Sequence, residues 1–271
     1  MPTGNDGLLL RQCCELAALH VLLRASGSSR FHVFCTHAAE PFVRCDPSVG
    51  VHGHDQLNRI LNLAQAQNKP LPAGTKLRTS PIIDVLASLR ASPDSYPNSV
   101  RILDHAAKQL RVSLTGVLVD SDPVVEQVLR EAFPPPSFRV FGGDWRKPMA
   151  RYRSYDAPWL FTTTPGAFTH RAAARAAAEM QAIGEHVDRV LVPAGHPGVV
   201  SVFYDPMDEP ARAEFWGAAV DAFGQHDAEF VAVPSRTKGK LHVGVLVATA
   251  KNVLAPLLDD VRASLQTVDP V

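Results

Sequence analysis

Short β-branched runs alternate along the chain with longer stretches of helical periodicity. This alternation is typical of a largely parallel β-sheet that is covered by helices on both faces. The pattern predicts seven strands, at residues 31–36, 114–119, 137–141, 159–163, 199–204, 229–233 and 243–248. The last two flank only the segment "SRTKGKLH", so we expect them to form an antiparallel pair at the edge of the sheet.

The segment between the first two predicted strands is too long for a simple crossover. It contains helical patterns at residues 54–67 and 80–91, and a further helix at 100–110 returns the chain to the sheet. We therefore predict one α/β domain formed by residues 1–45 and 96–271. Residues 46–95 are predicted to form a helical insertion subdomain.

The composition is that of an ordinary globular protein, with 46% hydrophobic and 20% charged residues in a chain of 271. Its 27 basic residues balance 27 acidic ones, so no global field draws it to nucleic acid or to a membrane surface. Arg11 and Glu15 interrupt the apolar run near the N-terminus, which predicts a helix of a cytoplasmic protein rather than a signal peptide. No apolar run reaches the length that spans a bilayer.

Cysteine and histidine spacing gives little support to a metal site. Cys13, Cys14, Cys35 and Cys45 match no zinc or redox motif, and we interpret them as reduced structural thiols. His52, His54 and Asp55 form a short cluster, but further spaced ligands are missing, so a solvated loop is favoured over a metal centre.

In such sheets ligands bind outside the carboxyl ends of the strands, so candidate site residues follow each strand. A parallel sheet that ends in an antiparallel pair is the outline of a class I methyltransferase. The motifs "GNDGLLLRQ", "CTHAAEP", "YPNS", "VDSDP", "GGDWRKP" and "FTTTPGAF" occur in order along the chain. Together they resemble, over essentially the whole length, the large-subunit (23S) ribosomal RNA adenine-N6 methyltransferase J family.

The resemblance implies an S-adenosylmethionine site with an altered loop. Asp120 stands at the position of the ribose-binding acid, and Asp144 at that of the acid beside the adenine. The remaining implied cofactor-site residues are Arg11 in place of the family's lysine, Ser99, and Thr36, His37, Ala39 and Glu40 after the first strand. Ala39, Glu40 and Pro41 replace the family's G-A-G, so the loop loses the close approach that glycine permits.

The family's catalytic D-P-P-Y motif is also altered. Thr163 or Thr164 stands in place of the aspartate, and Phe168 is the candidate for the aromatic residue that stacks on the base. The family's aspartate accepts hydrogen bonds from the adenine amine while the tyrosine stacks on an extruded base. A threonine hydroxyl can accept such a bond but carries no negative charge.

Each candidate also has a structural interpretation. Acids after strands often cap helices, as Asp122 is expected to do, and the same holds for Asp120 and Asp144. His37 is equally compatible with a buried, hydrogen-bonded histidine, and Arg11 with a solvated helix face. The basic runs at residues 146–153 and 236–240 are interpreted as solvated surface rather than as a phosphate-binding face.

Three hypotheses follow. The chain is an active S-adenosylmethionine-dependent methyltransferase with a remodelled loop, acting on RNA, DNA, or a nucleoside-like or other small molecule, with or without a partner chain. Alternatively, it is a non-catalytic scaffold of the same fold. The third hypothesis is an enzyme in which His37, Glu40 and Asp144 perform different chemistry in the old pocket. Because both motifs are altered, loss of adenine-N6 activity is favoured.

Overall fold

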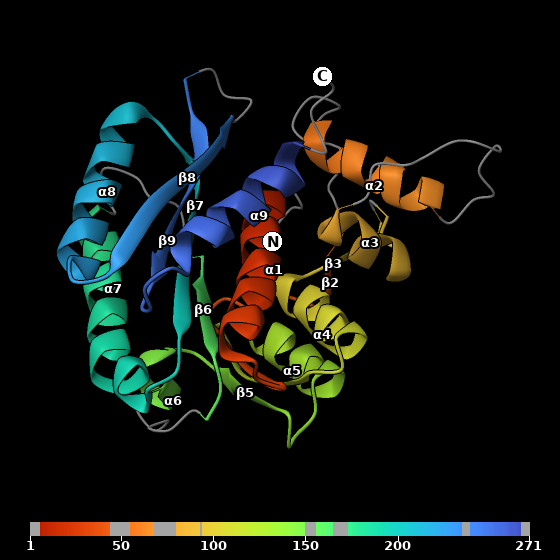
Figure 1. Cartoon of the computed structure of the whole chain (residues 1–271), viewed down its shortest axis with the longest axis horizontal. Coiled ribbons are helices and arrows are strands. Elements are labelled where there is room, and N and C mark those ends of the chain that lie inside the picture. The colour runs from red at the N-terminus through yellow and green to blue at the C-terminus, as the bar shows by residue number, and fades with distance from the viewer. Residues whose placement is uncertain are drawn as a thin grey trace.

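A seven-stranded sheet organises the chain (Figure 1). The computed structural model describes residues 6–43, 55–67, 80–92, 94–149, 156–164, 173–234 and 239–266. The strand order across the sheet is β5-β4-β1-β6-β7-β9-β8. The strands are β1 (Arg30–Cys35), β4 (Ser113–Asp120), β5 (Phe138–Gly142), β6 (Trp159–Thr163), β7 (Gly198–Met207), β8 (Asp227–Pro234) and β9 (Leu241–Ala248).

All seven predicted strands are confirmed, with ends that differ by a few residues. Neighbouring strands from β5 to β7 are parallel, whereas β9 runs antiparallel to both β7 and β8. The antiparallel edge pair is therefore β8 with β9, as the short connection between them predicts. The α/β fold class with a mostly parallel sheet is confirmed.

Helices cover both faces of the sheet (Figure 1). One face carries α1 (Asp6–Ser26), α4 (Ser99–Gln109), α5 (Pro123–Ala132) and α9 (Leu254–Gln266). The other carries α6 (Arg146–Met149), α7 (Ala173–His186) and α8 (Glu209–Phe223), and α7 continues into a π-helical turn at Val187–Leu191 and a 3-10 turn at Val192–Ala194. We refer to these as the α1 face and the α7 face.

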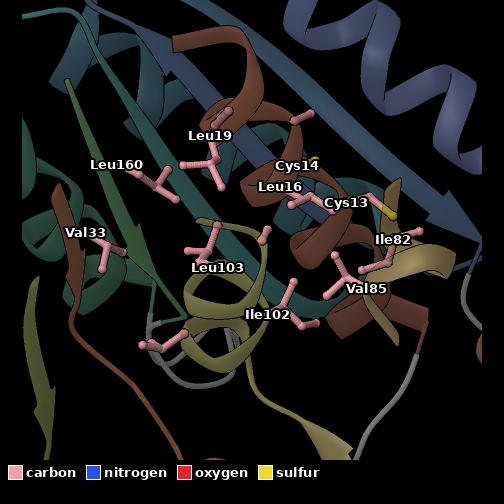
Figure 2. Close-up of a cluster of buried hydrophobic side chains, with 14 of the residues drawn as sticks. Cys13, Cys14, Leu16, Leu19, Val33, Ile82, Val85, Ile102, Leu103 and Leu160 are labelled. Carbon is pink, nitrogen blue, oxygen red and sulfur yellow. The ribbon is translucent and has the colours of Figure 1, made fainter. Parts of the chain in front are cut away.

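Strand side chains alternate between the two layers, as the pleat requires. In β1, Phe31, Val33 and Cys35 pack on the α1 face, whereas Phe34 packs on the α7 face. Figure 2 shows the α1-face cluster, where Leu16 and Leu19 of α1 meet side chains of α3, α4, β1 and β6. The alternation decides on which side of the sheet each polar residue at a strand end lies.

The described cysteines are buried free thiols. Cys13 and Cys14 lie in α1 and Cys35 ends β1. Burial raises the pKa of Cys13 to about 12 and that of Cys35 to about 11, so both stay protonated at neutral pH. The interpretation as structural thiols is confirmed for these three, and Cys45 lies outside the described residues.

A second, two-stranded sheet joins β2 (Phe42–Val43) to β3 (Tyr96–Pro97) in antiparallel register. Its strands lie close to the two boundaries of the predicted insertion. Strands of two residues are too short to show periodicity, which explains why the sequence did not predict them. The helical patterns of this segment are confirmed as α2 (Asp55–Gln67) and α3 (Pro81–Ser88), while the division into subdomains stays a prediction.

None of the helices in the described ranges is both long and apolar enough to cross a membrane.

An aromatic cluster on the α7 face holds His186 against Phe34, Trp145 and Phe161, with ring centroids 6.1–6.4 Å apart. Burial lowers the pKa of His186 to about 4. Between pH 6.5 and 4 the unfolded chain gains a proton there that the folded chain does not, so acid weakens the fold by about 1.4 kcal/mol per pH unit. When the pH is lowered from 7 to 5.5, the free energy of unfolding of the parent should fall by about 1 kcal/mol more than that of the His186→Phe variant. Urea unfolding at the two pH values measures both changes. An identical loss would contradict this.

Candidate functional site

The carboxyl ends of four parallel strands meet at one edge of the sheet. Cys35 pairs in register with Leu118 of β4 and Thr162 of β6, and Asp120 pairs with Gly142 of β5. Four of the predicted site residues, Thr36, Asp120, Asp144 and Thr163, therefore end or follow strands that lie side by side, whereas Arg11 lies in α1 and Ser99 begins α4. This is the edge at which open α/β sheets bind their ligands.

On the α7 face of this edge, Thr36, His37 and Thr163 form one cluster. The hydroxyl of Thr36 donates to Oγ1 of Thr163 at 2.5 Å, and Nδ1 of His37 lies 2.9 Å from the Thr36 hydroxyl and 3.2 Å from that of Thr163. Burial, and then the charge of Arg11, lowers the pKa of His37, so its imidazole is neutral at pH 7. Thr163 is fully buried, and its hydroxyl is occupied within the protein.

On the α1 face, the buried ion pair of Arg11 and Glu15 in α1 contacts the end of β6. Nε of Arg11 donates to Glu15 at 2.7 Å, one turn further along α1. The guanidinium also donates to the hydroxyl of Thr164 and, at 3.5 Å, to the sulfur of Cys35, while Thr162 donates to the Glu15 carboxylate. Arg11 therefore does not lie on a solvated helix face, because it joins α1 to the ends of β1 and β6.

The loop that follows β1 is held by hydrogen bonds on both sides. The N–H groups of Ala38 and Ala39 donate to the carbonyl of Val119 at 3.1 Å and to the Asp120 carboxylate at 3.1 Å. The side-chain amide of Asn98 donates to the carbonyls of Ala38 and Ala39 at 2.8 and 3.1 Å, and the N–H of Asn98 donates to the carbonyl of Pro41. Sequence reasoning missed Asn98, although its position before a helix is a capping signal.

Ala39 has a left-handed backbone with a φ of 55°, in the loop where the resemblance implies glycine. Such a conformation costs a non-glycine residue roughly 1–2 kcal/mol, whereas glycine loses roughly 0.5–1 kcal/mol in chain entropy. We therefore expect Ala39→Gly to raise the free energy of unfolding by about 0.5–1 kcal/mol in urea titrations. The matched variant Ala38→Gly removes a buried methyl group at a position outside the left-handed region and should destabilise. Destabilisation by both variants would show that Ala39 is not strained.

The three acids have different surroundings. Asp120 is half-buried, and its two oxygens accept the N–H groups of Ala39 and Asp122 at 3.1 and 3.0 Å. Asp122 caps α5 through the N–H of Val124, as predicted. Asp144 is exposed, accepts the N–H of Arg146 at 3.1 Å and pairs with the Arg146 guanidinium. Asp120 and Asp144 thus both support local backbone, and the side chain of Asp144 is 43% exposed.

Glu179 is a site residue that the sequence did not reveal. Its carboxylate, from α7, accepts the indole N–H of Trp145 at 2.6 Å and the guanidinium of Arg146 at 2.9 Å. Its negative charge acts on the titration of His37 and of Tyr204. Burial, and then Glu179, raises the pKa of Tyr204 above its usual range. In the alanine-rich α7 sequence nothing distinguishes Glu179 from a solvent-facing acid.

Other candidates are not joined to this cluster. Ser99 is buried at the first turn of α4, and Glu40 is half-buried in the β1 loop. No hydrogen bond among the described residues joins His37, Glu40 and Asp144. Phe168 lies outside the described residues, as do His52, His54, Arg151, Arg153, Arg236 and Lys238. Within the part of the chain that the structure describes, no three metal-ligating side chains converge.

These surroundings fit the two halves of S-adenosylmethionine differently. The carboxylates of half-buried Asp120 and exposed Asp144 are acceptors of the kind that suits ribose hydroxyls and an adenine donor. The β1 loop does not suit the methionine half, because its N–H groups at Ala38 and Ala39 already have acceptors within the protein and Pro41 has no N–H. The β1 loop therefore has no free N–H at Ala38, Ala39 or Pro41 for an amino-acid tail.

The strand order and the site at the carboxyl edge define a class I methyltransferase-like α/β fold. Among solved structures, the chain is similar to protein LPL1258 of Legionella pneumophila, assigned to family model DUF519, with 15% identity over 98% of this chain and 92% of that one and a TM-score of 0.68. Spermidine synthase of Thermotoga maritima has 9% identity over 93% and 62% of the two chains, with a TM-score of 0.41. The likeness to LPL1258 is one of fold. No protein-family model and no curated protein sequence matches the chain.

Proposed function

We propose that the chain is a divergent protein of the adenine-N6 methyltransferase J lineage that binds an adenine nucleoside and does not methylate adenine N6. It is then a non-catalytic or repurposed member of the class I methyltransferase-like fold. The observation that supports the proposal most directly is the hydrogen bonding of Thr163 and Thr164 at the end of β6. Both hydroxyls are occupied within the protein, Thr163 by Thr36 and Thr164 by Arg11.

Methyl transfer to the exocyclic amine of adenine is favoured by a charged acceptor, because the nitrogen becomes cationic as it attacks. A preorganised charged partner typically contributes on the order of 10²-fold or more to the rate. Neither Thr163 nor Thr164 carries a charge, and Arg11 adds a positive charge beside Thr164. That charge disfavours a developing cation at this position.

Nucleoside binding is supported by two acids at the carboxyl ends of neighbouring strands, Asp120 at the end of β4 and Asp144 after β5. Each oxygen of Asp120 accepts one backbone N–H and keeps a further lone pair, which suits the two donors of a ribose diol. Asp144, beyond the end of β5, offers an acceptor to the adenine amine. Both roles coincide with those that the resemblance to the J family implies.

Two measurements test the proposal. Tritiated S-adenosylmethionine with unmodified large-subunit ribosomal RNA should yield no incorporation at adenine N6, and clear incorporation there would contradict the loss of activity. Calorimetric titration should detect binding of at least one of adenosine, S-adenosylmethionine and S-adenosylhomocysteine. Absence of binding by all three at millimolar concentration would contradict the nucleoside site.

Asp120→Asn should weaken nucleoside binding by about 1–3 kcal/mol, the scale of losing a hydrogen bond to a charged acceptor. Because the side chain also accepts the N–H of Ala39, thermal unfolding should be recorded alongside to show that the variant folds. The matched control is Asp156→Asn, an exposed acid paired with Arg30 on the surface, which should leave the affinity unchanged. Equal affinity of the Asp120→Asn protein and the parent would remove Asp120 from the site.

A further inference from the structure

We infer that the site selects adenine nucleosides that lack the amino-acid tail of S-adenosylmethionine, such as adenosine or 5′-deoxy-5′-methylthioadenosine. This inference rests on the proposed function and names the ligand class of the same site. It is carried by a difference in burial, hydrogen bonding and charge between the two halves of the site.

Burial separates the two halves. In the β1 loop, which the resemblance places beside the methionine tail, Thr36 and Ala38 are each 3% exposed, and the implied cofactor-site residues Arg11 and Ser99 are 7% and 4% exposed. On the nucleoside side, the side chain of Asp144 is 43% exposed and Asp120 is half-buried. A tail that enters beside Thr36 and Ala38 would have to displace packed protein, whereas on the nucleoside side the Asp144 carboxylate is open to solvent.

Hydrogen bonding points the same way. The N–H groups of Ala38 and Ala39 and the carbonyls of the same two residues are all bonded to β4 or to Asn98. At the first turn of α4, the side chain of Asn98 accepts the N–H of Arg101 at 2.8 Å. A tail carboxylate would have to break one of these bonds to use the N–H of Ala38 or Ala39, and a broken buried bond leaves an unsatisfied polar group.

Charge adds a further barrier to an amino-acid carboxylate. Arg11 is the cation among the implied cofactor-site residues, but all three of its guanidinium nitrogens donate, to Glu15, Thr164 and Cys35. Glu40 places a half-buried acidic residue in the loop itself. A carboxylate here would therefore meet a cation already engaged by Glu15 and a nearby like charge. A nucleoside without the tail brings no such charge.

The inference is tested by calorimetric titration of the full chain at pH 7 and one ionic strength with four ligands. These are adenosine, 5′-deoxy-5′-methylthioadenosine, S-adenosylhomocysteine and S-adenosylmethionine. The first two should bind at least about tenfold more tightly than the last two, the scale of one unsatisfied buried polar group. S-adenosylhomocysteine lacks the sulfonium charge, so it separates the effect of the tail from that of the cation.

The outcomes separate this inference from the proposed function. If S-adenosylhomocysteine or S-adenosylmethionine binds as tightly as adenosine, the inference is overturned and the nucleoside site stands. If none of the four binds at millimolar concentration, both are overturned. The double variant Glu40→Gln, Pro41→Gly removes the anion and restores an N–H to the loop. The affinities for ligands with and without the amino-acid tail should then differ by less than about threefold. An unchanged difference in a folded variant would show that the loop does not cause the selection.

Discussion

Replacing Arg11 with methionine is expected to lower the free energy of unfolding by about 3–5 kcal/mol, the usual cost of removing one partner of a buried ion pair. Glu15 is 1% exposed, and Arg11 is its charged partner at 2.7 Å. Without the guanidinium, its carboxylate keeps the hydroxyl of Thr162 but loses the opposite charge. Urea unfolding of the parent and the variant measures the difference.

A double variant distinguishes the ion pair from simple loss of packing. Arg11→Met combined with Glu15→Leu removes both charges and keeps apolar volume, and such replacements are often close to neutral. We therefore expect the double variant to recover most of the stability lost by Arg11→Met, which appears as a coupling energy in the double-mutant cycle. Additive losses would show that Arg11 and Glu15 do not stabilise one another.

Gly184→Ala is expected to destabilise the protein by about 3 kcal/mol, at the upper end of the cost of overpacking. A Cβ at Gly184 in α7 would lie 2.3 Å from the backbone carbonyl oxygen of Ala222 in α8. Because the obstacle is backbone, no side-chain rotation relieves it, and the two helices would have to separate. Denaturant unfolding measures the loss.

The matched control is Gly217→Ala in α8, where a Cβ meets nothing within 4 Å. There the usual advantage of alanine over glycine in a helix should appear, a gain of roughly 0.5–1 kcal/mol. Glycine-to-alanine substitution should thus lower the free energy of unfolding at Gly184 and raise it at Gly217, although the two helices pack together. A gain at both positions would mean that α7 and α8 tolerate a wider separation.

The sheet could be predicted from the sequence because its signal is local. Each strand is a β-branched or aromatic run, such as "GVLV" in β4, that is buried in the structure and bounded by polar or turn residues. The edge pair followed from the shortness of the segment between β8 and β9. The two-residue strands β2 and β3 fell below the length at which periodicity is visible.

The site was less predictable because its contacts join distant positions. Arg11 and Thr164 are 153 positions apart, and Trp145 and Glu179 are 34 apart on elements whose packing no local pattern reveals. Capping by Asp122 was predictable, since the acid and its proline-started helix adjoin in sequence. The β1 loop at Ala39 is held by Asn98, which is 59 positions away and follows the predicted insertion, so no local pattern indicated the contact.

The position of β9 has a consequence for synthesis of the chain on the ribosome. β8 is made before β9, yet β9 lies between β7 and β8 and is the strand to which β8 is hydrogen-bonded. Until residues 241–248 leave the ribosome, β7 presents an open edge and β8 has no place in the sheet. Nascent chains released early would therefore expose unpaired strands that invite aggregation.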